Sequence, residues 1–384
     1  MLIQDPIHGY IKLEELERDI LDTSSFQRLR RIKQLGFTNL VYPSATHSRF
    51  EHSLGTTYLA GKFSEYLELE EMSCKNLKAA AMLHDIGHGP FSHTSEKVFS
   101  KKGLSHEDFS IKKIKNSEIS SVLEKHGVDP EKVVSLIKGE GELGQLIAGD
   151  IDVDRMDYLM RDAHYSGVAH GVIDDETIMR AAEFKKGKLV FRYKFRPALE
   201  GLLTARYLMT PTVYMHRAVV RAEKMMGRAI EIFMEYEGLS VEKIAEMDDV
   251  DINYRLRNTD CERANFINKM LDQRKVFKPL TGERGMADYS RVEELLEGVS
   301  CERKAEKLIS DETGVDVKHL IVDISSKSKR GNINVDVLVN DEIKGLEEIS
   351  SICSSLDSFR NHPERINVYC NEDVIPDIEN FFVG

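Results

Sequence analysis

Apolar residues recur at three- and four-residue spacing through long stretches of the chain, and this spacing constrains the fold more than any other feature. It is clearest over Glu51–Leu69 and Cys74–Ile86, where runs of β-branched residues are few. Such spacing gathers apolar side chains on one face of an α-helix. We expect both stretches to be core helices, and the second must stop or kink just after His84-Asp85, because Gly87, Gly89 and Pro90 follow.

The same reasoning predicts further elements. An earlier helix is expected to run through Phe26 to Leu35, capped by Asp22–Ser25 and ended by Gly36. Later helices are expected at 118–125, 130–137, 143–148, 153–164, 175–182 and through 197–236. Alternating apolar residues predict a short hairpin over Leu2–Leu13 and a strand over Lys188–Phe195.

The length and a change of character along the chain predict two domains. At 384 residues the chain exceeds the usual size of one hydrophobic core. After about Gly298 three stretches have the composition of strands, namely Val317–Ile324, Ile333–Val339 and Ile366–Cys370. We therefore expect a mainly α protein, with a helical domain over 1–297 and a small α+β subdomain over 298–384.

Charge and cysteine content exclude several classes of function. The chain has 53 Lys+Arg against 65 Asp+Glu, a formal net charge of -12, which disfavours a protein that coats nucleic acid. A local basic pocket for a small anion remains compatible with this charge. The five cysteines form no C-x-x-C pair, and no apolar run reaches membrane-spanning length. We expect a cytoplasmic protein that contacts neither membrane nor nucleic acid.

The His84-Asp85 pair suggests chemistry because of where it lies. It follows Ala79-Ala80-Ala81-Met82-Leu83 on a helix that we expect to be buried, and an imidazole beside a carboxylate is costly to bury without a partner. A divalent metal ion would supply that partner, with His52 and Asp154 as further ligands from separate helices. Each has an ordinary alternative: His52 as a helix cap, and the run around Asp154 as a solvated acidic face. Such a ligand set accepts iron, manganese, zinc, nickel or magnesium.

Additional histidines and arginines surround these positions. His88, four residues after His84, would lie on a similar helical face if the helix continued, and His93 and His106 follow. Imidazoles can hold phosphate or transfer protons near neutral pH. Three arginines lie within or near these motifs, namely Arg49, Arg155 and Arg206. Their guanidinium groups could bind phosphate oxygens, and the alternative is that they are ordinary surface groups.

These residues together resemble a known family. His52, His84-Asp85 and Asp154 match the ordered H…HD…D signature of HD-domain phosphohydrolases. Longer motifs resemble the deoxynucleoside triphosphate triphosphohydrolase branch, typified by the animal sterile-alpha-motif/HD protein, over roughly the first 220 residues. They are Asp5–Gly9, Phe26–Arg30, Ile32–Gly36, His47–Gly55, His84–His93 and Ile151–Tyr158.

The resemblance implies roles for individual residues. It implies one metal ion bound by His52, His84, Asp85 and Asp154, and hydrolysis of a deoxynucleoside triphosphate to deoxynucleoside and inorganic triphosphate. Residues around the scissile phosphate would be His93, Glu96 and His106, with His106 as the proton donor. Phosphates would be bound by Arg49, His88, Arg155 and Arg206. The nucleoside would be bound by Gln34, Leu35, Tyr158, Asp162 and Tyr214. The family has aspartate where Glu96 stands, and its best-known member has lysine where Arg155 stands.

The resemblance also raises the possibility of regulation. Some members are tetramers activated by nucleotides, and residues that match or weakly resemble the activator site are Asp22, Gln27, Arg30, Arg274 and Lys278. The stretch Thr210-Pro211-Thr212-Val213 departs from the basic residues of the animal enzyme. A homo-oligomer, dimer or tetramer, with a nucleotide activator is thus a hypothesis. Two alternatives to the triphosphohydrolase stay open: an HD phosphohydrolase acting on another nucleotide or phosphoester, and a nucleotide sensor or scaffold without catalysis.

Overall fold

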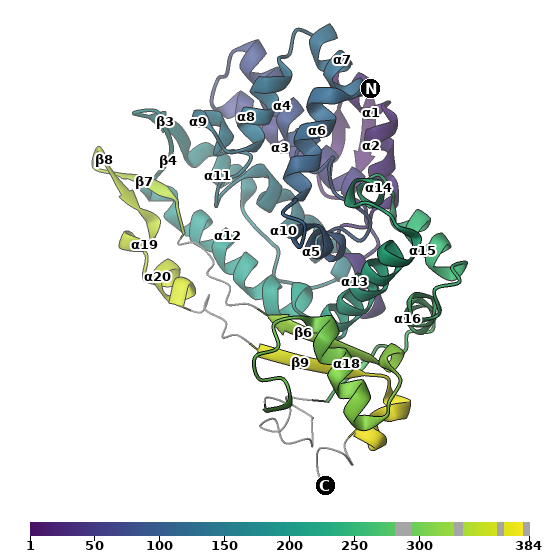
Figure 1. The fold of residues 1–384 in the computed structure, drawn as a ribbon. Coiled ribbons are helices and arrows are strands. Elements are labelled where there is room, and N and C mark those ends of the chain that lie inside the picture. Colours follow the sequence, from purple (N-terminus) through teal and green to yellow (C-terminus); the bar gives the residue numbers. More distant parts are fainter. Residues whose placement is uncertain (281–293, 326–332, 359–364, 379–384) are drawn as a thin grey trace. The chain divides into compact units, whose positions relative to one another are not determined.

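The computed structural model describes residues 1–280, 294–325, 333–358 and 365–378, and it is mainly α-helical (Figure 1). The chain forms two compact units. The first contains Met1–Met215, Ile244–Asp249 and the described part of 331–359, and the second contains the rest. The mainly α fold class predicted from the sequence is confirmed.

The first unit is a helical core. Its helices are α1 (Glu15–Leu21), α2 (Ser24–Arg28), α3 (Arg49–Tyr66), α4 (Glu71–Leu83), α5 (His93–Ser100), α6 (His106–Asn116), α7 (Glu118–Lys125), α8 (Pro130–Ile137), α9 (Gly141–Gly144), α10 (Val153–Ser166), α11 (Asp175–Ala181), α12 (Arg196–Met209), α19 (Leu346–Ile349) and α20 (Ser351–Ser358). A π-helical turn, Thr210–Tyr214, follows α12. Helix α3 is central, because it packs against both α4 and α10.

The second unit contains α13 (Arg217–Glu237), α16 (Glu262–Asp272) and α18 (Glu302–Thr313). The short segment Ile244–Asp249, which belongs to the first unit, runs from the end of α14 (Val241–Ala245) to the first residue of α15 (Asp249–Arg257). A three-stranded sheet in the order β5 (Lys278–Pro279), β9 (Arg365–Cys370) and β6 (Leu320–Ser325) completes this unit.

Two small sheets belong to the first unit. Strands β1 (Leu2–Asp5) and β2 (Gly9–Lys12) form the expected N-terminal hairpin. The other sheet has the order β3 (Ala182–Lys185), β4 (Lys188–Arg192), β7 (Asp336–Val339) and β8 (Glu342–Gly345). Strand β7 pairs in parallel with β4, with Val337 opposite Phe191. This division differs from the predicted boundary after residue 297, because residues 333–358 return to the first unit.

Most predicted helices are confirmed, and the errors have local causes. The expected helix through Leu35 is wrong: α2 passes into a 3-10 turn, Leu29–Arg31, and Ile32 is extended. The chain is extended there because Lys33 forms a β-bridge with Ser48. The helix expected over 143–148 is also displaced, since α9 covers Gly141–Gly144. Helices α5 and α6 were not predicted, because their sequences carry more polar than apolar residues. Among the described residues, no helix is long and apolar enough to cross a lipid bilayer.

The close packing of α3 and α10 requires glycine at position 55. A Cβ atom on Gly55 would overlap the carboxylate of Asp157 and crowd the guanidinium of Arg161, both of which are buried. On the same helix, a Cβ on Gly61 would lie 3.8 Å from the flexible side chain of Lys78. The two positions therefore provide a matched test of this packing.

We expect Gly55→Ala to destabilise the protein by about 1–3 kcal/mol, because the overlap forces a shift of α3 or α10. Gly61→Ala should instead be neutral or stabilising by up to about 1 kcal/mol, since alanine favours helix. Thermal and denaturant unfolding of both variants measure the difference. Equal stability of the two variants would contradict the close approach.

Candidate active site

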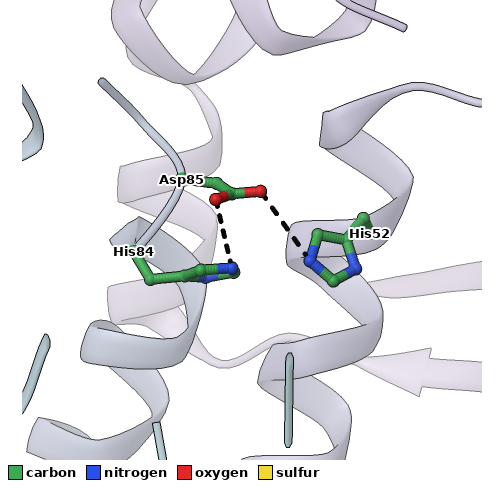
Figure 2. A group of neighbouring side chains, drawn as sticks. All are labelled: His52, His84 and Asp85. Carbon is green, nitrogen blue, oxygen red and sulfur yellow. Dashed lines mark ion pairs between the residues drawn. The ribbon is translucent and has the colours of Figure 1, made fainter. Parts of the chain in front are cut away.

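Three helix ends bring the proposed metal ligands together. His52 lies in the first turn of α3, which begins with a capping box between Ser48 and Glu51. His84 and Asp85 lie where α4 ends, as the following glycines and proline predicted. Asp154 lies in the first turn of α10. Figure 2 shows the Asp85 carboxylate between the imidazoles of His52 and His84.

The ligand atoms are spaced as atoms around one ion would be. Nε2 of His52 lies 2.9 Å from Oδ1 of Asp154 and 3.7 Å from Oδ2 of Asp85. Nε2 of His84 lies 3.4 Å from Oδ1 of Asp85 and 3.6 Å from Oδ1 of Asp154. Donors about 2.0–2.2 Å from a common ion are separated by roughly 3–3.6 Å. His52, His84 and Asp85 have ligand atoms that all lie within 4.8 Å of one another, and Asp154 places Oδ1 within 3.6 Å of both imidazole Nε2 atoms.

The hydrogen bonds of the two imidazoles fit a metal ion as well. Nδ1 of His84 lies 2.8 Å from the carbonyl oxygen of Ala81, which can only accept a hydrogen bond. The proton of a neutral His84 is therefore on Nδ1, and the lone pair of Nε2 faces the cluster. This buried Nε2 has no hydrogen-bond partner among the described residues. Nδ1 of His52 likewise donates to Asp157, at 2.8 Å, which leaves Nε2 for the cluster.

The electrostatics of the cluster favour a bound cation. Burial alone would lower the pKa of His52, but hydrogen bonds to Asp154 and Asp157 raise it to about 10. Burial alone would raise the pKa of Asp85, but the charge of Arg49 and the nearby histidines hold it well below its ordinary value. Burial alone would raise the pKa of Asp154, but the hydrogen bond with His52 and the nearby imidazole of His84 lower it. Ionised carboxylates thus draw a positive charge, either a proton or a metal ion, to the imidazole Nε2 atoms.

A second buried network, which the sequence analysis missed, supports His52 from behind. Asp157 accepts hydrogen bonds from His52 at 2.8 Å and from His8 at 2.7 Å. Arg161 binds both oxygens of Asp157 at 2.9 Å and also pairs with Asp5. Such partners fix the tautomer and the orientation of a metal-binding histidine. Asp5 and His8 lie in the motif Asp5–Gly9, and Asp157 lies in the motif Ile151–Tyr158. The contact between His8 and Asp157 joins residues about 150 positions apart, and no local pattern reveals it.

The predicted catalytic residues form a chain of contacts that begins at Asp85. Nε2 of His88 lies 3.2 Å from Oδ1 of Asp85, and its ring stacks on His106 with 4.0 Å between ring centroids. Glu96 hydrogen-bonds Nδ1 of His106 and lies 3.6 Å from Nδ1 of His93, whose side chain is 66% exposed. The structure therefore brings His93, Glu96 and His106 together. The helix does not continue to His88, because α4 ends at Leu83, and His88 reaches Asp85 from the turn that follows.

Two groups of acidic and imidazole side chains have ligand atoms close enough for a metal ion among the described residues. They are His52, His84 and Asp85, and, sharing the same carboxylate, Asp85, His88 and His106. The two histidines of the second group differ in the direction in which their pKa values are shifted. Burial and the charge of Arg49 hold the pKa of His88 well below its ordinary value. Burial also lowers the pKa of His106, but the hydrogen bond to Glu96 outweighs burial and raises it.

The predicted phosphate-binding arginines lie in two groups, one beside Asp85 and one beside Asp150. Arg49 pairs with Asp85 and donates from Nε to the hydroxyl of Ser92 at 2.6 Å. Arg155 pairs with Asp152, while Arg206 donates to Oδ1 of Asp150 at 3.1 Å. Nη2 of Arg155 also lies 3.8 Å from Asp150, so both arginines face one carboxylate.

Three of the predicted nucleoside-binding residues are in contact. The hydroxyl of Tyr214 donates to Asp162 at 2.9 Å, and the rings of Tyr214 and Tyr158 meet edge to face at 6.1 Å. Gln34 is linked to them through His47: the Gln34 N–H donates to the His47 carbonyl, and the His47 ring hydrogen-bonds Asp162. Leu35 follows Gln34 and is partly buried. Their role in binding a nucleoside stays a prediction.

The residues predicted for an activator fall in both units. Nε of Arg30 donates to the side chain of Gln27 at 2.8 Å, and Asp22 is exposed at the end of α1. Arg274 and Lys278 belong to the second unit. An activator site built from these five residues stays a prediction.

Comparison with known proteins gives the family. A model of the HD domain matches residues 49–162, and a model of the HD associated region matches residues 173–383. An uncharacterized protein of Methanocaldococcus jannaschii is 35% identical over 385 residues, which cover 98% of this chain and 80% of that protein. The chain belongs to the HD-domain family, in the form that carries the HD associated region.

Two further relatives indicate the kind of chemistry. The human deoxynucleoside triphosphate triphosphohydrolase SAMHD1 is 36% identical over 209 residues, which cover 44% of this chain and 33% of that protein. The crystal structure of a phosphohydrolase from Bacteroides thetaiotaomicron superposes with a TM-score of 0.77 at 27% identity, covering 97% of this chain and 99% of that one. These likenesses support a hydrolase of the HD superfamily.

We expect His84→Ala to reduce the bound divalent metal from about one ion per chain to a small fraction, because an HD site that loses one of four ligands loses most of its affinity. His126→Ala is the control, since His126 pairs with Asp19, away from the described ligands. Elemental analysis of protein purified without chelators measures the metal, and circular dichroism checks the fold. Full metal retention by a folded His84→Ala variant would contradict the site.

Proposed function

We propose that this protein is a metal-dependent hydrolase that converts deoxynucleoside triphosphates to deoxynucleoside and inorganic triphosphate. One observation carries the proposal: two imidazole Nε2 atoms and the carboxylates of Asp85 and Asp154 converge, and Asp85 also contacts a pair of stacked histidines. The likeness to a named deoxynucleoside triphosphate triphosphohydrolase supports the choice of substrate.

His52, His84, Asp85 and Asp154 would hold the metal ion. When bound, a divalent ion polarises a phosphoryl oxygen and stabilises the charge that develops there. Asp157 would keep the Nδ1 proton on His52, and the Ala81 carbonyl would keep the Nδ1 proton on His84. These partners hold the two imidazoles in the orientation that the ion requires.

The arginines would bind the triphosphate. Arg155 and Arg206 face the Asp150 carboxylate, and a phosphate oxygen could take the place of that carboxylate, because both are anions that accept charge-assisted hydrogen bonds. Binding the three phosphates by their charge would also stabilise the negative charge that develops on the α-phosphoryl oxygens and on the triphosphate product.

His106 and Glu96 would handle the proton. Water attacks the α-phosphorus, a new P–O bond forms, and the bond from phosphorus to the 5′ oxygen of the deoxynucleoside breaks. One proton of the water stays on the triphosphate, and the other passes to solvent, from which His106 is protonated again. Protonated His106 would donate its proton to that departing oxygen, and Glu96 stabilises the protonated imidazole through the bond at Nδ1. His88 has a strongly lowered pKa and would stay neutral beside it.

Product identity tests the proposal. The purified protein, loaded with Mn²⁺, is incubated with a panel of deoxynucleoside triphosphates, ribonucleoside triphosphates, monophosphates and cyclic dinucleotides. We expect deoxynucleoside and inorganic triphosphate in equal amounts. Release of orthophosphate without triphosphate would contradict this reaction, and hydrolysis of another panel member alone would favour a different HD phosphohydrolase. Tight binding without turnover would favour a nucleotide sensor.

We expect Glu96→Gln to move the alkaline limb of the kcat profile to lower pH. Protonated His106 is the active form, so turnover falls as pH rises through its pKa, and Glu96 raises that pKa against the effects of burial and Arg49. The neutral amide lowers the pKa of His106, and we expect turnover at pH 8 to fall about ten-fold or more. His88 and Asp85, which also face His106, are unchanged. Glu107→Gln, on the exposed side of α6, is the control, and an unshifted limb in Glu96→Gln would exclude His106 as the acid.

We expect Arg206→Ala to raise KM for the deoxynucleoside triphosphate about ten-fold, because a charged hydrogen bond to phosphate contributes roughly 1.5–3 kcal/mol. The metal content should not change, since Arg206 pairs with Asp150, which is not one of the proposed metal ligands. Arg180→Ala is the control, because Arg180 pairs with Glu176 on the exposed side of α11. Steady-state kinetics measures KM, and an unchanged value would remove Arg206 from the substrate site.

Nucleotide activation and a homo-oligomer are proposals of the same kind. They are supported by the matches at Asp22, Gln27 and Arg30. Light scattering and turnover are measured as each nucleotide is added. A rise in both mass and turnover would support them, and constant values of both would count against them.

A further inference from the structure

The turn that follows α4 carries much of the site but has an unfavourable backbone. We define the ligand turn as residues 84–92, which include Asp85 and His88 and lead into α5 at His93. Near its end Phe91 has φ +53° and Ser92 has φ +43° with ψ −105°. Side-chain-bearing residues rarely adopt positive φ, and such strain persists only where the surroundings hold it. The ligand turn therefore needs contacts from outside itself.

Asp249 supplies the contact at the strained end. Its Oδ1 accepts a hydrogen bond from the Phe91 N–H at 2.6 Å, and its Oδ2 accepts one from the Lys33 N–H at 3.0 Å. The residue is only 5% exposed, so water competes little for these bonds. Because each carboxylate oxygen accepts one backbone N–H, the side chain ties Phe91 to the extended segment at Lys33.

Arg28 ties the other part of the ligand turn to the same segment of chain. Its Nη2 donates to the carbonyl oxygens of Ile86 at 3.0 Å and His88 at 2.7 Å. Its Nη1 donates to the carbonyl oxygen of Met247 at 2.8 Å. The segment Ile244–Asp249 thus contacts the ligand turn twice, through Arg28 and directly through Asp249.

The strained end is also connected to the metal ligands. The hydroxyl of Ser92 accepts a hydrogen bond from Nε of Arg49 at 2.6 Å, and Arg49 pairs with Asp85. A displacement of Phe91 and Ser92 would therefore move Arg49, and with it the charge that faces Asp85. It would also move the start of α5, which carries Glu96.

We propose that Asp249 is a positioning residue for hydrolysis, which holds the ligand turn in its strained, competent conformation. It lies in the HD associated region, outside residues 49–162 that match the HD domain. One buried carboxylate of the HD associated region thus holds the ligand turn of the HD domain. The expected change in kcat rests on the function proposed above, whereas the expected change in the ligand turn does not.

The test compares Asp249→Asn and Asp249→Ala with Glu246→Gln. Asparagine keeps the volume of aspartate but replaces one acceptor by an N–H₂ group, which cannot accept from Phe91 or Lys33. Glu246 lies in the same segment, is largely exposed and pairs with Lys113 of α6, so it is the matched control. Amide hydrogen exchange in the full chain, metal content and steady-state kinetics are measured for each variant. If Asp249→Ala does not fold, the comparison is made with Asp249→Asn alone.

We expect the Phe91 amide and its neighbours in the ligand turn to exchange about ten-fold faster in Asp249→Asn, with exchange in α3 and α10 unchanged. The metal content should be retained, while kcat falls about ten-fold and KM changes less than about three-fold. Unchanged exchange in the ligand turn would overturn the proposal, as would an equal increase throughout the first unit or an unchanged kcat. If the wild-type protein hydrolyses no nucleotide, the proposed function fails, whereas the exchange comparison still decides whether Asp249 holds the turn.

Discussion

The arrangement of the site depends on two imidazoles whose Nε2 atoms face ionised carboxylates in a buried cluster. Each imidazole has its Nδ1 committed elsewhere, His52 to Asp157 and His84 to the Ala81 carbonyl. Nε2 of His84 is 3.4–3.6 Å from the carboxylate oxygens of Asp85 and Asp154, too far for a good hydrogen bond. A proton on Nε2 of His84 would therefore have no good acceptor, whereas a metal ion held by these groups would bind the lone pair of that nitrogen.

Much of the first unit serves to hold this cluster. The N-terminal hairpin supplies Asp5 and His8, which reach the proposed ligand His52 through Arg161 and Asp157. Gly55 allows α3 to approach Asp157 closely enough for the contact. On the other side, Arg28 and Asp249 hold the turn after α4. The proposed ligands thus come from the helix ends, and the residues that fix them come from distant parts of the sequence.

The contrast between local and distant contacts explains what the sequence could predict. Helices α3, α4, α7 and α8 have regular apolar spacing, and the glycines and proline after Asp85 correctly predicted the end of α4. The convergence of His52, His84, Asp85 and Asp154 followed from the ordered motif. By contrast, the bond between His8 and Asp157 and the bond between Phe91 and Asp249 each join residues about 150 positions apart. Neither has a local pattern, and the expected helix through Leu35 failed because a bridge to Ser48 extends the chain there.

Anomalous diffraction from crystals of the protein grown with Mn²⁺ tests the metal centre most directly. The account predicts a single strong peak bonded to Nε2 of His52, Nε2 of His84 and one carboxylate oxygen each of Asp85 and Asp154, at about 2.0–2.3 Å. A peak bonded instead to Asp85, His88 and His106, or no peak within reach of His52 and His84, would contradict it.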